Sequence, residues 1–348
     1  MNVTAKITGI NYTPFLCEDL LDYNLEDLES ALTQKGYFRL NLDNNNKIAI
    51  SWWVSAKRTR SYPYARVYNT LAYIGRKATI IPIFKDEGKD GDRDYLQWDT
   101  ISLMSLLGVY VIIAFYSSAT KNEKYRNKIT NQRFDDDLIN SELQNLLSYQ
   151  SDALHWNLQQ IERVGIIGQK AIDAYLKISN DTGVEFHSMV LAQKRIDELK
   201  KSKDVFMNLS RQLAEEAAKR ESVTLQPKES IRGEKGTITI RNYLGGIYHF
   251  TSDEVRIEGK KVYLIEAKHS KSRALPSKDD IKDGLLKMIL YTNLEDVRIG
   301  KLQLEPIPVL KLTTGNGFNV ETLTFKQKIL LEKLKEESEV NNFNLVFK

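Results

Sequence analysis

The stretch Ser252–Lys268, SDEVRIEGKKVYLIEAK, decides the fold of the C-terminal third of this chain, because it predicts a β-hairpin of defined register. Glycine suits the first central position of a two-residue type II′ turn, so Gly259 and Lys260 are expected at the tip. Pairing then runs outward from the turn. The predicted opposed pairs are Ile257 with Val262, Val255 with Leu264, and Asp253 with Glu266.

The predicted hairpin brings two carboxylates together at its open end. Side chains alternate between the faces of a strand, so these six residues share one face, apolar near the turn and acidic at the far end. Directly opposed Cβ atoms lie about 5 Å apart, so the two acids repel each other unless a positive charge lies between them. A divalent cation meets that need, and Mg²⁺ suits hard oxygen ligands with open positions for substrate phosphate. We therefore expect Asp253 and Glu266, with the Ala267 carbonyl, to hold Mg²⁺.

Lys268 completes this candidate site. It lies two residues after Glu266 and so points to the same face of the strand. Its ammonium is expected to orient or help deprotonate an attacking water and to stabilise the charge that develops on phosphorus. The site predicts cleavage of a phosphodiester bond. The alternative without a function is a surface hairpin whose exposed charges form an ion pair that contributes little to stability.

The segments around the hairpin predict an α/β (α+β) domain with a mixed sheet. Residues 237–240, 246–250 and 254–258 read as separate strands, and Ser277 to Leu294 has a helical period with Ser277 as its N-cap. A strand around Pro306–Leu310 and a charged helix over Phe325–Glu339 follow.

The spacing of Asp253 from Glu266-Ala267-Lys268, on a strand after a hairpin, resembles the PD-(D/E)xK nuclease core of type II restriction endonucleases. The resemblance covers roughly residues 205–315. It implies a helix before the hairpin that offers another acid, for which Glu215 or Glu216 on the predicted helix Asp204–Arg220 are candidates, and a helix and a strand after the lysine. The usual proline is replaced by Ser252.

The resemblance also implies a function. We expect a type II restriction endonuclease that hydrolyses double-stranded DNA with Mg²⁺, leaves a 5′-phosphate, acts as a homodimer on a palindromic site and has a cognate DNA methyltransferase as a companion. Two alternatives stay open. One is a repair or recombination nuclease on the same core, and the other is a DNA-binding protein whose core is inactive.

The preceding residues predict two further regions. Residues 1–135 are expected to form an α/β DNA-recognition region, residues 136–203 a helical connection, and residues 204–348 the catalytic domain. The basic and aromatic stretch from residue 57 to 66 suits a groove-facing surface, although an ordinary surface strand and loop remains an alternative. After the hairpin, basic residues are either phosphate contacts or a solvated loop. The candidate DNA contacts are Lys57, Arg58, Arg60, Tyr64, Arg66, His269, Lys271 and Arg273.

Bulk properties narrow the class of protein. The 348 residues are 42% hydrophobic and carry a formal charge of +4, which permits a sizeable core and suits nucleic acid weakly. The single cysteine excludes an intramolecular disulfide framework and favours the cytoplasm. The apolar stretch Ile101–Phe115 is too short to span a membrane. Dispersed histidines give no zinc motif, and the acidic residues after Phe84 predict a charged loop in preference to a metal site.

Overall fold

The computed structural model describes residues 1–43, 46–57, 61–199, 234–242, 247–315 and 317–348. The chain divides into two compact units. The C-terminal unit contains Met1–Glu18 and the described residues from Glu234 to Lys348, and the N-terminal unit contains the described residues from Asp19 to Leu199. The mixed α/β class predicted from sequence is confirmed. No helix among the described residues is long and apolar enough to cross a membrane.

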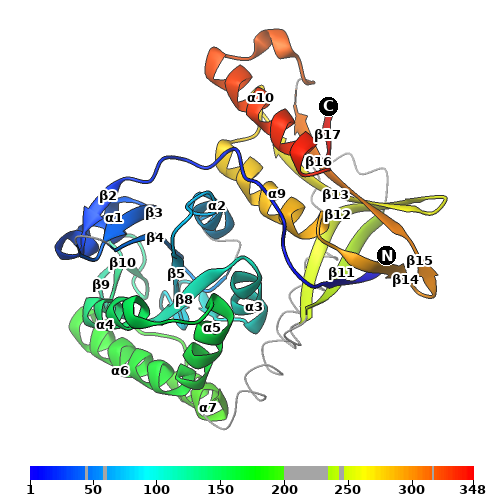
Figure 1. Ribbon diagram of the computed structural model, residues 1–348. Coiled ribbons are helices and arrows are strands. Elements are labelled where there is room, and N and C mark those ends of the chain that lie inside the picture. Colours follow the sequence, from blue (N-terminus) through cyan, green and yellow to red (C-terminus); the bar gives the residue numbers. More distant parts are fainter. Residues whose placement is uncertain (44–45, 58–60, 200–233, 243–246, 316) are drawn as a thin grey trace. The chain divides into compact units, whose positions relative to one another are not determined.

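The C-terminal unit is built on one mixed sheet with helices packed against it (Figure 1). Within the described part of the chain, neighbouring strands follow the order β15 (Leu302–Gln303), β14 (Glu295–Ile299), β1 (Asn2–Ile7), β11 (Glu234–Asn242), β12 (Ile247–Glu258), β13 (Lys261–Ser270), β16 (Glu305–Thr314) and β17 (Asn344–Phe347). The helices among its described residues are α9 (Lys278–Tyr291), the 3₁₀ turn η2 (Val320–Thr322) and α10 (Phe325–Val340).

One helix of this unit, α9, packs on the parallel strands β13 and β16. β11, β12 and β13 are antiparallel in turn, whereas β13 and β16 are parallel and are connected through α9 followed by β14 and β15. Ser277 caps α9 by accepting a hydrogen bond from the Asp280 N–H, and α9 then packs on β13 and β16. The helix and the strand expected after Lys268 are therefore both present.

The hairpin of β12 and β13 has the predicted register. Val255 pairs with Leu264 and Ile257 with Val262, and Gly259 adopts a φ of 61°, the positive value that a type II′ turn requires. The ladder begins at the pair Glu254 and Ile265, one residue short of Asp253.

Two expectations about β12 and the domain division are wrong. Residues 246–250 and 254–258 are not separate strands, since β12 runs unbroken from Ile247 to Glu258 against β11, with an irregularity in the pairing between Ser252 and Val255.

The N-terminal residues of the chain are not part of the region that was expected over residues 1–135. β1 instead pairs in parallel with β11 and buries Val3, Ala5 and Ile7 in the C-terminal unit.

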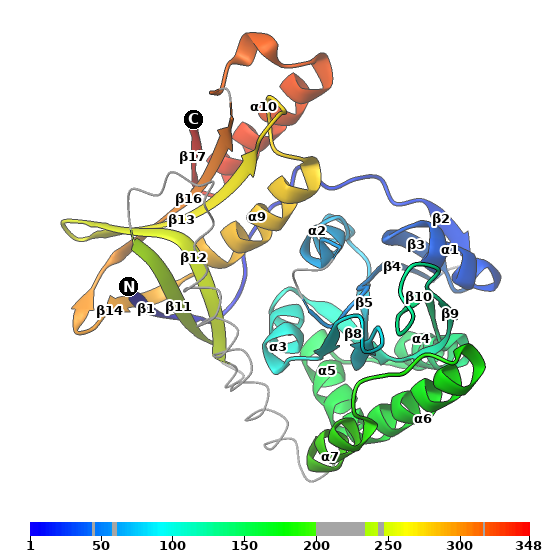
Figure 2. The same cartoon turned by 180° about the vertical axis from the view of Figure 1, so that it is seen from behind.

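The N-terminal unit contains a second sheet, whose described strands follow the order β2 (Asp22–Asn24), β3 (Tyr37–Asn41), β4 (Lys47–Trp52), β5 (Lys77–Pro82) and β8 (Val109–Ala114). Two hairpins accompany it, β6 (Phe84–Asp86) with β7 (Arg93–Tyr95) and β9 (Tyr116–Lys121) with β10 (Ile129–Phe134). Figure 2 shows the helices of its described residues, which are α1 (Leu28–Gln34), α2 (Pro63–Tyr68), α3 (Trp98–Leu106), α4 (Asp136–Ser148), α5 (Ala153–Glu162), α6 (Val164–Thr182) and α7 (Met189–Leu199). A 3₁₀ turn, η1 (Leu25–Asp27), precedes α1.

The acidic residues after Phe84 are not a simple solvated loop. Asp86 is fully buried, with one carboxylate oxygen 2.8 Å from Nδ1 of His187, and Glu87 forms ion pairs with Lys85 at 2.9 Å and Lys128 at 3.3 Å. Burial of a charge is tolerated only where partners compensate it, so this cluster has a structural explanation.

Candidate functional site

Glu266 is the centre of the candidate site in the C-terminal unit. It lies near the carboxyl end of β13 and is only 2% exposed. Its two carboxylate oxygens accept different ammonium groups, Oε1 at 3.0 Å from Lys268 Nζ and Oε2 at 2.7 Å from Lys287 Nζ. The prediction that Lys268 points to the same side as Glu266 is thus confirmed.

Asp253 reaches the same place from β12. Its Oδ2 accepts a hydrogen bond of 2.7 Å from the Ala267 N–H, which is the next residue after Glu266. Backbone pairing between β12 and β13 ends at Glu254, so the Asp253 side chain takes a donor that a continued ladder would have used. Ser252, on the preceding position, ties the strands together through its hydroxyl, which donates to the Ile265 carbonyl at 2.9 Å. The predicted proximity of Asp253 to Glu266-Ala267 is therefore present.

Lys268 also contacts helix α9. Its Nζ donates to Asp283 Oδ2 at 2.7 Å in addition to the contact with Glu266. A side chain at Gly284 would obstruct this arrangement, because an added Cβ would lie 3.2 Å from Lys268 Cε and 2.8 Å from Leu310 Cδ1. Glycine at this position of the helix therefore leaves the space through which the Lys268 side chain passes.

Lys287 is the second cation of the site, and sequence reasoning missed it. It extends from α9, and its Nζ donates to the Thr251 carbonyl at 2.9 Å and to Glu266 at 2.7 Å. Asp283 and Lys287 are four residues apart, a spacing that places both on one helix face. Lys287 interrupts the apolar run Leu285–Tyr291 four residues after Asp283, and this pattern is the signal that could have identified them.

The charges of the cluster set its protonation. Burial by itself raises the pKa of Glu266, but the attraction of Lys287 and Lys268 outweighs it, so that pKa lies below its ordinary value. Burial alone lowers the pKa of Lys287, yet Glu266, with a contribution from Asp253, raises it above the ordinary value. The pKa of Lys268 is raised in the same way by Glu266 and Asp283. All three groups are therefore charged at neutral pH.

The site supplies carboxylates, the donor type that Mg²⁺ prefers, but both oxygens of Glu266 are already paired with ammonium groups. Asp253, Glu266 and Asp283 supply three carboxylates against the two ammonium groups of Lys268 and Lys287, which leaves a formal charge of −1. Oxygen donors in a negatively charged site suit a hard cation. In the described part of the chain, no group of three or more acidic, histidine or cysteine side chains is arranged to hold a metal. The third ligand predicted from sequence, the Ala267 carbonyl, is a backbone group and is not among the side chains considered there. An ion bound at Glu266 would have to displace one of the two ammonium groups that contact this carboxylate.

The candidate DNA contacts have different surroundings. Tyr64 is 4% exposed and packs edge-on against Trp53, while the Arg66 guanidinium stacks over Trp52 and donates to its carbonyl at 2.9 Å. Tyr64 is thus a core residue and not the groove-facing side chain expected from sequence, because its ring is needed to fill the N-terminal unit. Lys57 is exposed.

The basic residues after the hairpin lie in the C-terminal unit. His269 Nδ1 is 2.8 Å from Thr313 Oγ1, whereas Lys271 and Arg273 are exposed on the loop between β13 and α9. Their roles in DNA binding remain predictions. Arg58, Arg60 and the candidate acids Glu215 and Glu216 lie outside the described residues.

Comparison of this chain with protein-family models, with curated proteins and with solved structures finds no match.

Proposed function

We propose that this protein is a Mg²⁺-dependent endonuclease that cuts double-stranded DNA in the manner of a type II restriction enzyme. The observation that supports the proposal most directly is the junction of β12 and β13. There Asp253 binds the Ala267 N–H at 2.7 Å and Glu266 lies 3.0 Å from the Lys268 ammonium. Two carboxylates and a lysine are thus gathered at one end of the hairpin.

Each residue has a role that follows from its position. Asp253 and Glu266, with the Ala267 carbonyl, would hold Mg²⁺, which when bound polarises the phosphate and lowers the pKa of a coordinated water. Lys268 is protonated, so it orients the attacking water by a hydrogen bond and stabilises negative charge on the phosphate oxygens. Lys287 compensates the charge of buried Glu266 and fixes its orientation.

The contacts of Lys268 also bear on the expectation that it helps to deprotonate the attacking water. Because its pKa is raised by Glu266 and Asp283, the Lys268 ammonium keeps its proton while these contacts persist and does not act as a general base. We therefore assign Lys268 to orientation and charge stabilisation. Homodimerisation, a companion methyltransferase and a cytoplasmic location belong to the same proposal.

The experiment is cleavage of unmethylated plasmid DNA in the presence of Mg²⁺. We expect discrete fragments with the wild-type chain and none with Lys268→Met, which should still shift DNA in a gel. Lys261→Met is the matched control, since Lys261 lies on the same strand but is exposed and outside the cluster. Unchanged cleavage by Lys268→Met would overturn the assignment.

The same assay separates the two alternatives. Nicking confined to branched or damaged DNA would favour a repair or recombination nuclease. DNA binding without any cleavage, in Mg²⁺ or Mn²⁺, would favour an inactive binding protein.

A further inference from the structure

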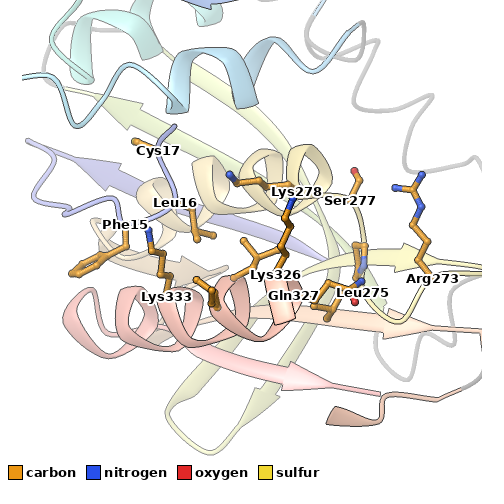
Figure 3. Close-up of a pocket in the computed structure, with 13 residues that line it drawn as sticks. Phe15, Leu16, Cys17, Arg273, Leu275, Ser277, Lys278, Lys326, Gln327 and Lys333 are labelled. Carbon is orange, nitrogen blue, oxygen red and sulfur yellow. The ribbon is translucent and has the colours of Figure 1, made fainter. Parts of the chain in front are cut away.

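A cavity of about 390 Å³ lies in the C-terminal unit (Figure 3). Its lining includes none of Asp253, Glu266, Lys268, Asp283 and Lys287, which are called the acidic cluster below. Its walls come from three segments, which are Phe15–Cys17, the loop that leads from β13 into the start of α9, and the first half of α10. A volume of this size accommodates a ligand no larger than a small organic molecule or a single nucleotide.

The lining of the cavity combines an apolar floor with cations. Its apolar part, here called the floor, consists of Leu16 and Leu275, each 2% exposed, together with Ile329 and Leu330 of α10. Four basic side chains complete the lining, and Figure 3 shows them contributed from both sides of the space. They are Arg273, Lys278, Lys326 and Lys333.

These cations are incompletely neutralised. Lys278 forms an ion pair with Glu18 at 3.1 Å. Within the part of the chain that the structure describes, Arg273, Lys326 and Lys333 form no ion pair, and the cavity lining contains no carboxylate. The cavity is therefore complementary to a ligand that has an apolar body and a negative charge.

The position of the cavity relates it to the acidic cluster. Lys278 at the start of α9 and Asp283, the partner of Lys268, are five residues apart, which corresponds to about 7 Å along the helix axis. Arg273 likewise follows Lys268 by five residues. α9 therefore contributes residues both to the cavity and to the Lys268 site.

We propose that this cavity binds one unpaired nucleotide of the DNA strand, with the base on the apolar floor and the adjoining phosphate on the basic rim. The inference rests on the proposed function for the presence of DNA. A base pair stacked in a duplex cannot enter a space of this size, so the occupant has to be an extrahelical nucleotide, whose base gains apolar contact in the pocket.

The test measures affinity in EDTA, where the DNA is not cut. The probes are two labelled duplexes with a one-nucleotide bulge, one carrying thymine at the bulge and the other an abasic residue, so that both have the same charge. With the wild-type chain we expect at least about fivefold tighter binding of the thymine bulge by fluorescence anisotropy.

Variants connect this preference to the cavity. Ile329→Trp fills the space and should abolish the preference for thymine over the abasic residue. Val340→Trp, on an exposed position of the same helix outside the cavity, should retain it. Lys326→Glu, at an exposed position, should weaken binding of both probes.

Equal affinity for the two bulges, or a preference that survives Ile329→Trp, would overturn the proposal. If the chain cleaves plasmid in a Lys268-dependent manner yet ignores the base, only the nucleotide cavity fails. If it binds neither probe and cuts no DNA, the proposed function fails as well.

Discussion

Lys287 Nζ on α9 lies 2.7 Å from Glu266 Oε2 on β13, and both side chains are almost completely buried. This ion pair joins the helix to the strand that carries the candidate catalytic residues. In the hairpin alone, the carboxylates of Asp253 and Glu266 would repel each other without a compensating positive charge. The structure supplies that charge by placing ammonium groups beside them.

Replacing Lys287 with Met should destabilise the protein strongly. Removal of one partner from a buried ion pair leaves an uncompensated charge, and the expected loss is about 3–5 kcal/mol in the free energy of unfolding. Urea denaturation measures it. The double variant Lys287→Met with Glu266→Gln should recover part of the loss, and a double-mutant cycle with no coupling would contradict the role assigned to this pair.

The metal-free protein should lose stability in acid in part through Glu266. Its folded pKa is depressed, so its contribution is fully present above the ordinary value of 4.5 and is lost as pH falls through the lower, folded pKa. Denaturation measured in EDTA between pH 7 and 3 should therefore show a smaller acid loss for Glu266→Gln than for wild type. Identical pH profiles would argue against the charged, paired state of Glu266.

Asp283→Asn should slow cleavage while leaving DNA affinity unchanged. Asp283 positions the Lys268 ammonium through a 2.7 Å hydrogen bond, and the amide cannot hold it with the same charge. We expect kcat to fall several-fold with little change in KM. Asp279→Asn, exposed in the first turn of the same helix, serves as the control, and equal effects of both substitutions would exclude a positioning role.

Gly284→Ala tests the passage of Lys268 over α9. Alanine in a helix interior ordinarily stabilises a protein by about 1 kcal/mol relative to glycine. Here the added methyl would press on Leu310 and Lys268, so we expect no gain in thermal stability and at least a roughly tenfold loss of cleavage rate. A stabilised variant of full activity would show that the space is not needed.

The register of the hairpin was predictable because it depends on neighbours in the chain. A glycine turn and the alternation of side chains along each strand suffice to align β12 with β13, so that Val255 pairs with Leu264. The same alignment brings Asp253 toward Ala267. The N-cap at Ser277 marked the start of α9 for the same reason. Local geometry also placed Lys268 beside Glu266, since both lie on one strand.

The sequence by itself therefore determined the hairpin, the side chains that share its face and the elements that follow it. Only the tertiary structure decided that Lys287 and Asp283 face those side chains, that Gly284 leaves room for Lys268, and that β1 joins β11 across more than two hundred residues of sequence. These relations depend on which surfaces pack together. Packing is set by the burial of apolar area over the whole unit, and that property has no local signature in the chain.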